Sequence, residues 1–232
     1  NEFIIDVLPK KLNEALTEAC LIIENDAELD VNFELNGNIP IFTIVDNNLV
    51  KSFDAIINNP KFNINILNEF GEPLLQSLLY EYRANPTDAC KKMIISVLNS
   101  KNYNFNAQNI NLDTAINVAV ERANTTWVVA ELVKNPNLDI NTPNDINLTP
   151  FENAISNKNE AAMKMLGARP DLKIREHETN EVAHNKGVKY EQYIKPSESV
   201  FTTTVVNASA NPTEISAEEY AKMFSACFSK SN

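Results

Sequence analysis

The sequence is short of the residue types on which catalysis and metal binding most often depend. Only 2 His and 3 Cys occur among its 232 residues. Cys20, Cys90 and Cys227 show no CxxC spacing, which indicates reduced thiols that pack in a core. His177 and His184 are too far apart to be the i, i+4 ligand pair of a zinc-binding helix, so surface positions are expected for both. We therefore expect no metal site, no cofactor and no catalytic residue.

Glycine, basic residues and long apolar runs are scarce as well. Only 4 Gly are present, which excludes a Gly-rich phosphate loop. Lys and Arg number 20 against 31 Asp and Glu, and the resulting formal charge of −11 argues against a nucleic-acid partner. No run approaches the ~18 uncharged apolar residues of a membrane span. The sequence thus predicts a folded cytoplasmic protein without a membrane partner.

Asparagine, in contrast, is abundant. The chain has 35 Asn, a residue type favoured in turns because its side chain hydrogen-bonds the nearby backbone. The first residue is Asn1 rather than Met, so we expect a fragment or a trimmed product whose upstream segments are not represented here.

A short motif recurs along the chain. It consists of two aliphatic residues, four or five polar or Pro residues, and then a hydrophobic residue, Asn or Asp, a hydrophobic residue and Asn. Four copies end at Asn32, Asn65, Asn106 and Asn141, and a weaker fifth ends at Lys173, giving intervals of 33, 41, 35 and 32 residues. Such a period is the signature of a repeat architecture.

A second signature follows each of the first four copies and opens an apolar-periodic stretch. Its four occurrences are Ile39-Pro40-Ile41, Glu72-Pro73-Leu74, Thr114-Ala115-Ile116 and Thr149-Pro150-Phe151. Pro is favoured in the first turn of a helix, and a preceding Thr can cap that turn. We therefore predict a turn and two antiparallel helices per unit. The predicted first helices are 40–46, 73–83, 114–123 and 150–157, and the second helices are 49–58, 87–99, 125–135 and 159–167.

These units resemble the ankyrin repeat family. The likeness is carried by Asp30-Val31-Asn32 through Gly37-Asn38-Ile39-Pro40-Ile41, and by Asp139-Ile140-Asn141 through Thr149-Pro150-Phe151, with Ala154 at the family's small-residue position. No copy keeps the family's His after Thr-Pro-Leu. The resemblance implies an all-α, ankyrin-type helical-repeat solenoid of about four to five helix pairs that binds a protein through its concave face.

Four segments are expected along the chain. Residues 1–28 are predicted to form an N-terminal capping helix or half repeat, and residues 29–174 the ankyrin-like repeats. The polar stretch 175–195 is predicted to cap the stack. Residues 196–232 read as a linker and an amphipathic tail helix, introduced by a capping box at Ser216-Ala217-Glu218-Glu219. The tail helix could fold back on the last repeat or enter a groove of another protein.

The resemblance and the register place candidate partner-binding residues on the turn tips and the first helices. Phe70, Ile110 and Ile146 are large apolar side chains in loops that should be polar, so they either form exposed anchors or fold under the tips. Tyr80 and Glu121 are either contacts on the concave face or ordinary amphipathic positions. The candidate residues are Asn36, Asn68, Phe70, Tyr80, Asn109, Ile110, Glu121, Asn144 and Ile146.

The resulting hypothesis is a non-enzymatic module that recognises a partner protein. The Asn, Ile and Lys bias is similar to that of ankyrin proteins from AT-rich organisms, including effectors that pathogenic bacteria deliver into host cells, which would place the chain in host cytosol. Two alternatives remain open. One is part of an enzyme whose catalytic residues lie upstream of Asn1 or include Cys227 or His184, and the other is a self-assembling scaffold.

Overall fold

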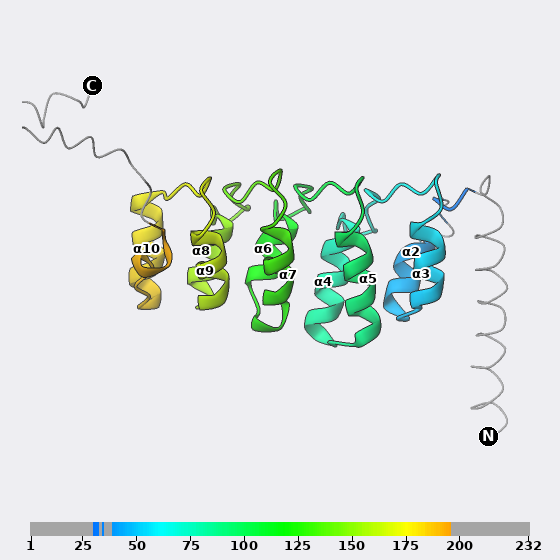
Figure 1. Cartoon of the computed structure of the whole chain (residues 1–232), viewed down its shortest axis with the longest axis horizontal. Helices are drawn as coiled ribbons and strands as arrows, with labels where there is room; N and C mark the ends of the chain where they lie inside the picture. The colour runs from blue at the N-terminus through cyan, green and yellow to red at the C-terminus, as the bar shows by residue number, and fades with distance from the viewer. Residues whose placement is uncertain (1–29, 33, 35–38, 196–232) are drawn as a thin grey trace, which may run out of the picture. The chain divides into compact units, whose positions relative to one another are not determined.

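The structure is a computed structural model, and it describes residues 30–32, 34 and 39–195 (Figure 1). This part of the chain is helical, and its only β-type pairing is a bridge between Leu67 and Pro73. The helices are α2 (Pro40–Asp46), α3 (Val50–Ile57), α4 (Leu74–Ala84), α5 (Asp88–Leu98), α6 (Ala115–Val120), α7 (Thr126–Leu132), α8 (Pro150–Ser156), α9 (Glu160–Gly167) and α10 (Glu176–Lys186), with 3₁₀ turns η1 (Ala123–Thr125) and η2 (Glu191–Tyr193). The prediction of an all-α protein is confirmed for these residues.

Consecutive helices pack as pairs, and the pairs lie side by side in a row (Figure 1). The loops that join one pair to the next all lie at the same end of the helices. The first helices of the pairs contact each other in the order α2, α4, α6, α8 and α10, while α3 contacts α5 and α7 contacts α9. The described chain therefore has two helical layers, and α10 extends the layer of first helices.

All eight helices predicted between residues 40 and 167 are present, with small differences at their ends. Pro73 is the residue before α4 rather than its first residue, since its ψ of 150° is extended. The helix predicted over 114–123 ends at Val120, because Arg122 adopts an extended conformation and a 3₁₀ turn follows. The predicted cap at Thr149 is confirmed, and it forms a reciprocal capping box with Glu152.

The core is a continuous apolar cluster between the two layers. In α4, for example, Leu74, Leu75, Leu78 and Leu79 are fully buried. Cys90 of α5 belongs to the same core, where its thiol donates a hydrogen bond to the carbonyl of Leu78 at 3.4 Å. Burial, with a smaller contribution from Glu81, raises the pKa of Cys90 to about 12. The expected packing role is thus confirmed for this cysteine, whereas Cys20 and Cys227 lie outside the described residues. None of the helices in this part of the chain combines the length and the apolar character needed to cross a membrane.

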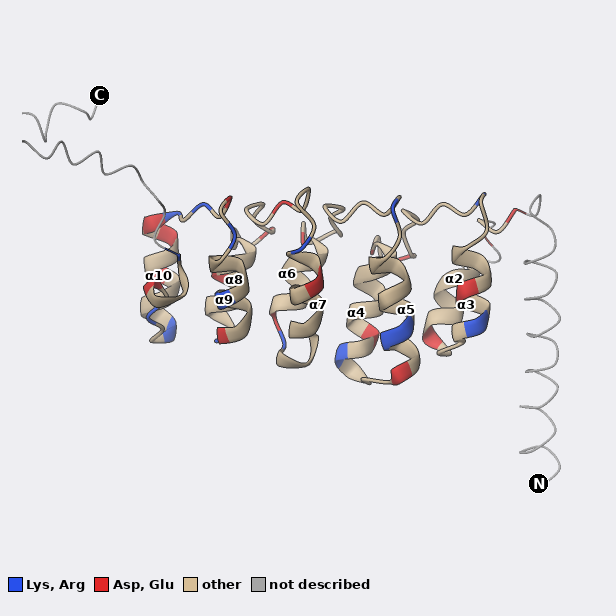
Figure 2. Ribbon diagram, in the orientation of Figure 1, with Lys and Arg blue, Asp and Glu red and all other residues tan. Residues whose placement is uncertain are grey.

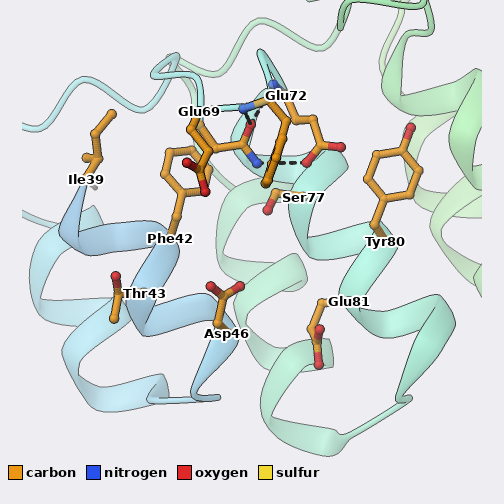
Figure 3. A pocket seen from close by; sticks show the side chains of 11 residues that line it. Ile39, Phe42, Thr43, Asp46, Glu69, Glu72, Ser77, Tyr80 and Glu81 are labelled. Atoms are coloured by element: carbon orange, nitrogen blue, oxygen red, sulfur yellow. Dashed lines mark hydrogen bonds between the residues drawn. The ribbon is translucent and has the colours of Figure 1, made fainter. Parts of the chain in front are cut away.

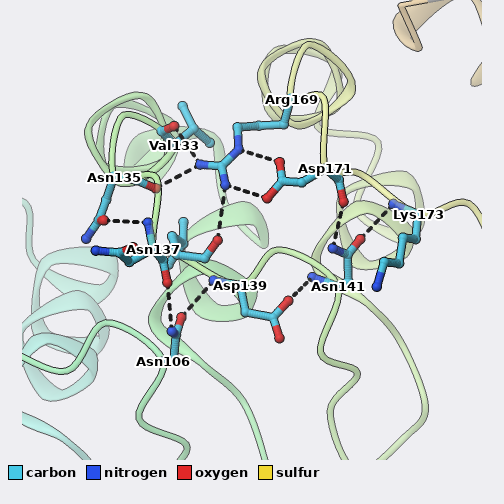
Figure 4. A network of polar contacts seen from close by, with 10 residues as sticks. Asn106, Val133, Asn135, Asn137, Asp139, Asn141, Arg169, Asp171 and Lys173 are labelled. Carbon is cyan, nitrogen blue, oxygen red and sulfur yellow. Dashed lines mark hydrogen bonds and ion pairs between the residues drawn. The ribbon is translucent and has the colours of Figure 1, made fainter. Parts of the chain in front are cut away.

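The last asparagine of each sequence copy joins its loop to the next loop (Figure 4). Its side-chain NH₂ donates to a backbone carbonyl of the following copy, and its side-chain oxygen accepts a hydrogen bond from a backbone N–H two residues further on. Asn32 bonds in this way to Lys61 and Asn63, Asn65 to Asn102 and Asn104, Asn106 to Asn137 and Asp139, and Asn141 to Asp171 and Lys173. A short side chain with both a donor and an acceptor is required, which Asn supplies and Asp does not.

Replacing one of these bridging residues should weaken the packing between neighbouring pairs. We expect Asn106→Ala to lower the free energy of unfolding by about 1–2 kcal/mol, because two hydrogen bonds are lost. Urea denaturation followed by circular dichroism measures the loss. Asn102→Ala is the matched control, since that side chain is exposed and forms no hydrogen bond with another described residue. Equal unfolding midpoints for the two variants would show that the bridge contributes nothing.

Polar helix α10 and the segment after it close the described part of the chain, within the predicted segment 175–195. Most of α10 is exposed, but Thr179 and Ala183 are buried, and the ring of Tyr190 packs edge-on against Phe151 with centroids 6.1 Å apart. The backbone then passes so close to Gly167 that a Cβ there would lie 2.0 Å from the carbonyl oxygen of Tyr193. Glycine is therefore needed at 167. The predicted segments 1–28 and 196–232, including the tail helix, lie outside the described residues.

Candidate partner-binding site

Three loops between the helix pairs are built on one plan. They cover residues 68–72, 109–113 and 144–148, and each begins with an asparagine that folds the loop around its own side chain. The backbone N–H of this asparagine donates to the carbonyl of the fifth residue, whose N–H donates back to the asparagine side-chain oxygen at 2.8, 3.0 and 2.9 Å respectively. The fourth residue is left-handed in each loop, with φ of 72° at Gly71, 56° at Leu112 and 60° at Asn147.

The large apolar side chains of these loops point into solvent. Phe70 is 62 % exposed, Ile110 is 74 % exposed and Ile146 is 67 % exposed. Of the two alternatives left open by the sequence, folding under the tip is therefore wrong for all three. The loops 68–72 and 109–113 also lie close together, because a Cβ on Gly71 would lie 2.7 Å from the Ile110 side chain. We call Phe70, Ile110 and Ile146 the tip row.

The candidate asparagines at the loop tips lie beneath the tip row. Asn109 and Asn144 are only 6 % and 8 % exposed. The amide of Asn109 donates to the hydroxyl of Tyr80 on α4 at 3.1 Å, and that of Asn144 donates to the buried carboxylate of Asp113 at 2.9 Å. Little of either side chain is left for a partner to touch. Asn68 is half-buried and donates to Glu72, and Asn36 lies outside the described residues.

Tyr80 and Glu121, the candidates from the first-helix layer, are brought together by Arg83. Its guanidinium pairs with Glu121 at 2.7 Å and lies over the Tyr80 ring, 5.5 Å from the centroid. Burial raises the pKa of Tyr80 to about 12, and the negative charges of Asp113, Glu121 and Glu72 act in the same direction. Burial also raises the pKa of Asp113, against the hydrogen bond from Asn144. The region behind the tip row is therefore both crowded and negatively charged.

Polar residues near the start of α4 and α6 hold the loops 109–113 and 144–148 onto the preceding pair, and neither residue was among the candidates expected from the sequence. The fully buried Gln76 of α4 donates from its side-chain nitrogen to the carbonyls of Ala107 and Asp113, both at 2.9 Å. Asn117 of α6 donates to the carbonyl of Leu148 at 3.4 Å. The available signal was a single polar residue in an otherwise apolar helical face. These bonds hold the loops that carry Ile110 and Ile146.

A pocket of about 300 Å³ lies between α2 and α4 (Figure 3). Aromatic side chains line it from both helices and from the first described tip, namely Phe42, Tyr80 and Phe70. Carboxylates lie at both ends. Glu69 and Glu72 come from the loop, while Asp46 and Glu81 come from the parts of α2 and α4 farther from it. This pocket could not be predicted from the sequence, because its residues come from three segments that only the packing of α2 against α4 brings together.

The two histidines and the single tryptophan have simple surroundings. His177 and His184 are exposed on α10. Trp127 packs edge-on against Tyr82 with centroids 5.8 Å apart, and the ammonium of Lys91 lies 5.1 Å from its ring centroid. In the part of the chain that the structure describes, no group of three or more His, Cys, Asp or Glu side chains could hold a metal ion.

No known protein family and no curated protein matches this chain. Its function therefore has to be inferred from the tip row, the pocket and the hydrogen bonds that hold them in place.

Proposed function

We propose that this chain is an ankyrin-type repeat solenoid that binds a partner protein through its loop tips and first helices, and that it is not itself an enzyme. The tip row carries the proposal: three large apolar side chains, each 62 % or more exposed, stand on successive loops of the same construction. A series of exposed large apolar side chains is typical of an interaction surface, whereas single exposed ones are common on any protein. The likeness to ankyrin repeats in the sequence supports the same role.

The rigidity of the loops favours binding as much as their exposure does. A side chain that is already held in place loses little conformational entropy when a partner covers it. Here the loop backbone is held by Asn68, Asn109 and Asn144 from within, and by Gln76 and Asn117 from the preceding helix. Phe70, Ile110 and Ile146 thus stand on loops whose backbone is held in place, and less energetic contacts can form around them.

The repeat character of the chain rests on the bridging asparagines. Asn32, Asn65, Asn106 and Asn141 make the same two hydrogen bonds to the following copy, so each unit contacts its neighbours in one recurring way. In a solenoid the last unit has a polar outer face, which suits α10. From the composition alone, we further propose that the chain is the targeting part of a bacterial effector and acts in the cytosol of a host cell.

Charged substitutions in the tip row should abolish partner binding without unfolding the chain. We expect the triple variant Phe70→Asp, Ile110→Asp, Ile146→Asp to bind the partner at least about 100-fold more weakly, since each anchor contributes on the order of 2 kcal/mol. The partner is identified by affinity capture from eukaryotic and bacterial lysates with mass spectrometry, and its Kd is then measured with purified protein.

A matched control uses the other helical layer. Ile95 of α5 is 40 % exposed and lies outside the tip row, so Ile95→Asp should leave the Kd unchanged. Circular dichroism and thermal melting verify that both variants are folded. If the folded triple variant kept the same partner with the same Kd, the tip row would not be the binding surface.

A further inference from the structure

The pocket between α2 and α4 has an unbalanced charge. None of its lining residues is basic, whereas Asp46, Glu69, Glu72 and Glu81 contribute carboxylates. Helix α2 contains no Lys or Arg, and α4 contains only one basic residue, Arg83 (Figure 2). Arg83 is already paired with Glu121. No described residue forms an ion pair with any of the four carboxylates. Carboxylates gathered in a recess focus a negative potential there.

The aromatic walls favour the same kind of occupant. The electron-rich face of an aromatic ring attracts a cation, and Phe42 of α2, Phe70 of the loop and Tyr80 of α4 all line the pocket. The chain itself uses this contact twice, with Arg83 over Tyr80 and Lys91 over Trp127. An anionic ligand would be repelled by the carboxylates, and a purely apolar one would leave them without a counter-charge. A cation on an apolar stem matches both the aromatic side chains and the carboxylates of the pocket.

The size and position of the pocket indicate where that cation comes from. A volume of about 300 Å³ is at the small end of the range for ligand pockets, so it suits a side chain better than a large cofactor. Phe70 belongs both to the pocket and to the tip row, so the pocket opens beside the surface proposed to bind a protein.

We propose that this pocket receives an arginine or lysine side chain from a basic segment of the partner protein, next to the apolar residues of that segment that cover the tip row. The statement that this side chain comes from a protein rests on the proposed function. The preference of the pocket for a cationic side chain does not, and it can be measured without the partner.

A short peptide tests the pocket directly. Ac-Gly-Arg-Gly-NH₂ is titrated into the ¹⁵N-labelled full chain up to about 10 mM, a range suited to a contact of millimolar affinity. The same peptide with citrulline in place of arginine is the matched probe, because citrulline has nearly the same shape without the charge. We expect the arginine peptide to shift the amide signals of Phe42, Asp46, Tyr80 and Glu81 in a saturable way, and the citrulline peptide to leave them unchanged.

Two double variants separate the pocket from the overall negative charge of the chain. Asp46→Asn with Glu81→Gln should weaken binding of the arginine peptide about fivefold or more, since two charge contacts of roughly twofold to fivefold each are lost. Glu131→Gln with Glu181→Gln removes the same charge from α7 and α10, and should leave the Kd within about twofold of the wild type.

Each of three results would overturn the proposal. Equal shifts with the arginine and citrulline peptides would show that the pocket does not select charge, and equal weakening in both double variants would show attraction to the whole chain only. A partner that still depends on the tip row while the arginine peptide fails to bind would remove this inference and leave the proposed function intact.

Discussion

Glu152→Ala should lower the free energy of unfolding by about 3–5 kcal/mol, because it leaves the charge of Arg175 without its partner in a partly buried site. Glu152 is 1 % exposed and joins α8 to α10. It forms an ion pair with Arg175, accepts a hydrogen bond from the Thr179 hydroxyl at 2.9 Å, and accepts another from the Thr149 N–H at 2.9 Å. Urea denaturation followed by circular dichroism measures the change.

The contribution of Glu152 should also depend on pH. Burial raises its pKa, but hydrogen bonds from Arg175, Thr149 and Thr179 outweigh burial, so the pKa is lowered from its ordinary value. A carboxyl with a lowered pKa in the folded state stabilises the fold above its unfolded pKa of about 4.3, and this stability is lost as the pH falls through the folded pKa. The stability difference between wild type and Glu152→Gln should therefore be greatest above about pH 5 and shrink toward pH 3.

An exposed carboxylate provides the control for both measurements. Glu181 lies on the solvent side of α10, so Glu181→Ala should change the unfolding free energy by less than about 0.5 kcal/mol at every pH. A loss below about 1 kcal/mol for Glu152→Ala would show that α10 is held to α8 by apolar packing rather than by this carboxylate.

Local sequence signals were enough to predict the eight helices between residues 40 and 167, because the first helix of each pair carries a Pro or Thr at its start and every helix shows apolar spacing. Thr149-Pro150 is an example, where the hydroxyl caps the turn that proline begins. The role of individual asparagines could not be predicted in the same way. Asn106 bridges two loops, whereas Asn109 folds one loop around itself, yet both are Asn in a turn and differ only in what the next unit brings close.

The orientation of the tip side chains also depended on three-dimensional context. The pattern Asn144-Asp145-Ile146 is compatible with Ile146 either above or below the loop. The structure places the side-chain oxygen of Asn144 inside the loop, where it accepts the Leu148 N–H, and Ile146 is left in solvent. Predicting the pocket between α2 and α4 would have required knowing how these two helices pack, although 27 residues of chain separate Asp46 from Leu74.

Arg169→Ala should lower the free energy of unfolding by about 3 kcal/mol, the second largest loss that we expect from a single change. The guanidinium donates to the carbonyls of Val133, Asn135 and Leu138 at 2.9, 2.9 and 3.2 Å, and so joins the segment after α9 to the segment after α7 (Figure 4). Asp171 holds it in place through two hydrogen bonds of 2.8 and 2.6 Å. Thermal and urea unfolding measure the loss.

Two further variants separate the charge of Arg169 from its geometry. Arg169→Lys keeps the charge but cannot span three carbonyls with one ammonium, so it should recover less than half of the loss. Asp171→Asn leaves the guanidinium bonds to the carbonyls possible and should cost only about 1 kcal/mol. Full stability of Arg169→Lys would show that charge alone suffices. The preceding copies have Asn59 and Asn135 before their prolines, and the side-chain oxygens of these residues accept hydrogen bonds only from their own loop. The longer Arg169 side chain instead reaches back to the previous helix pair, as the geometric account requires.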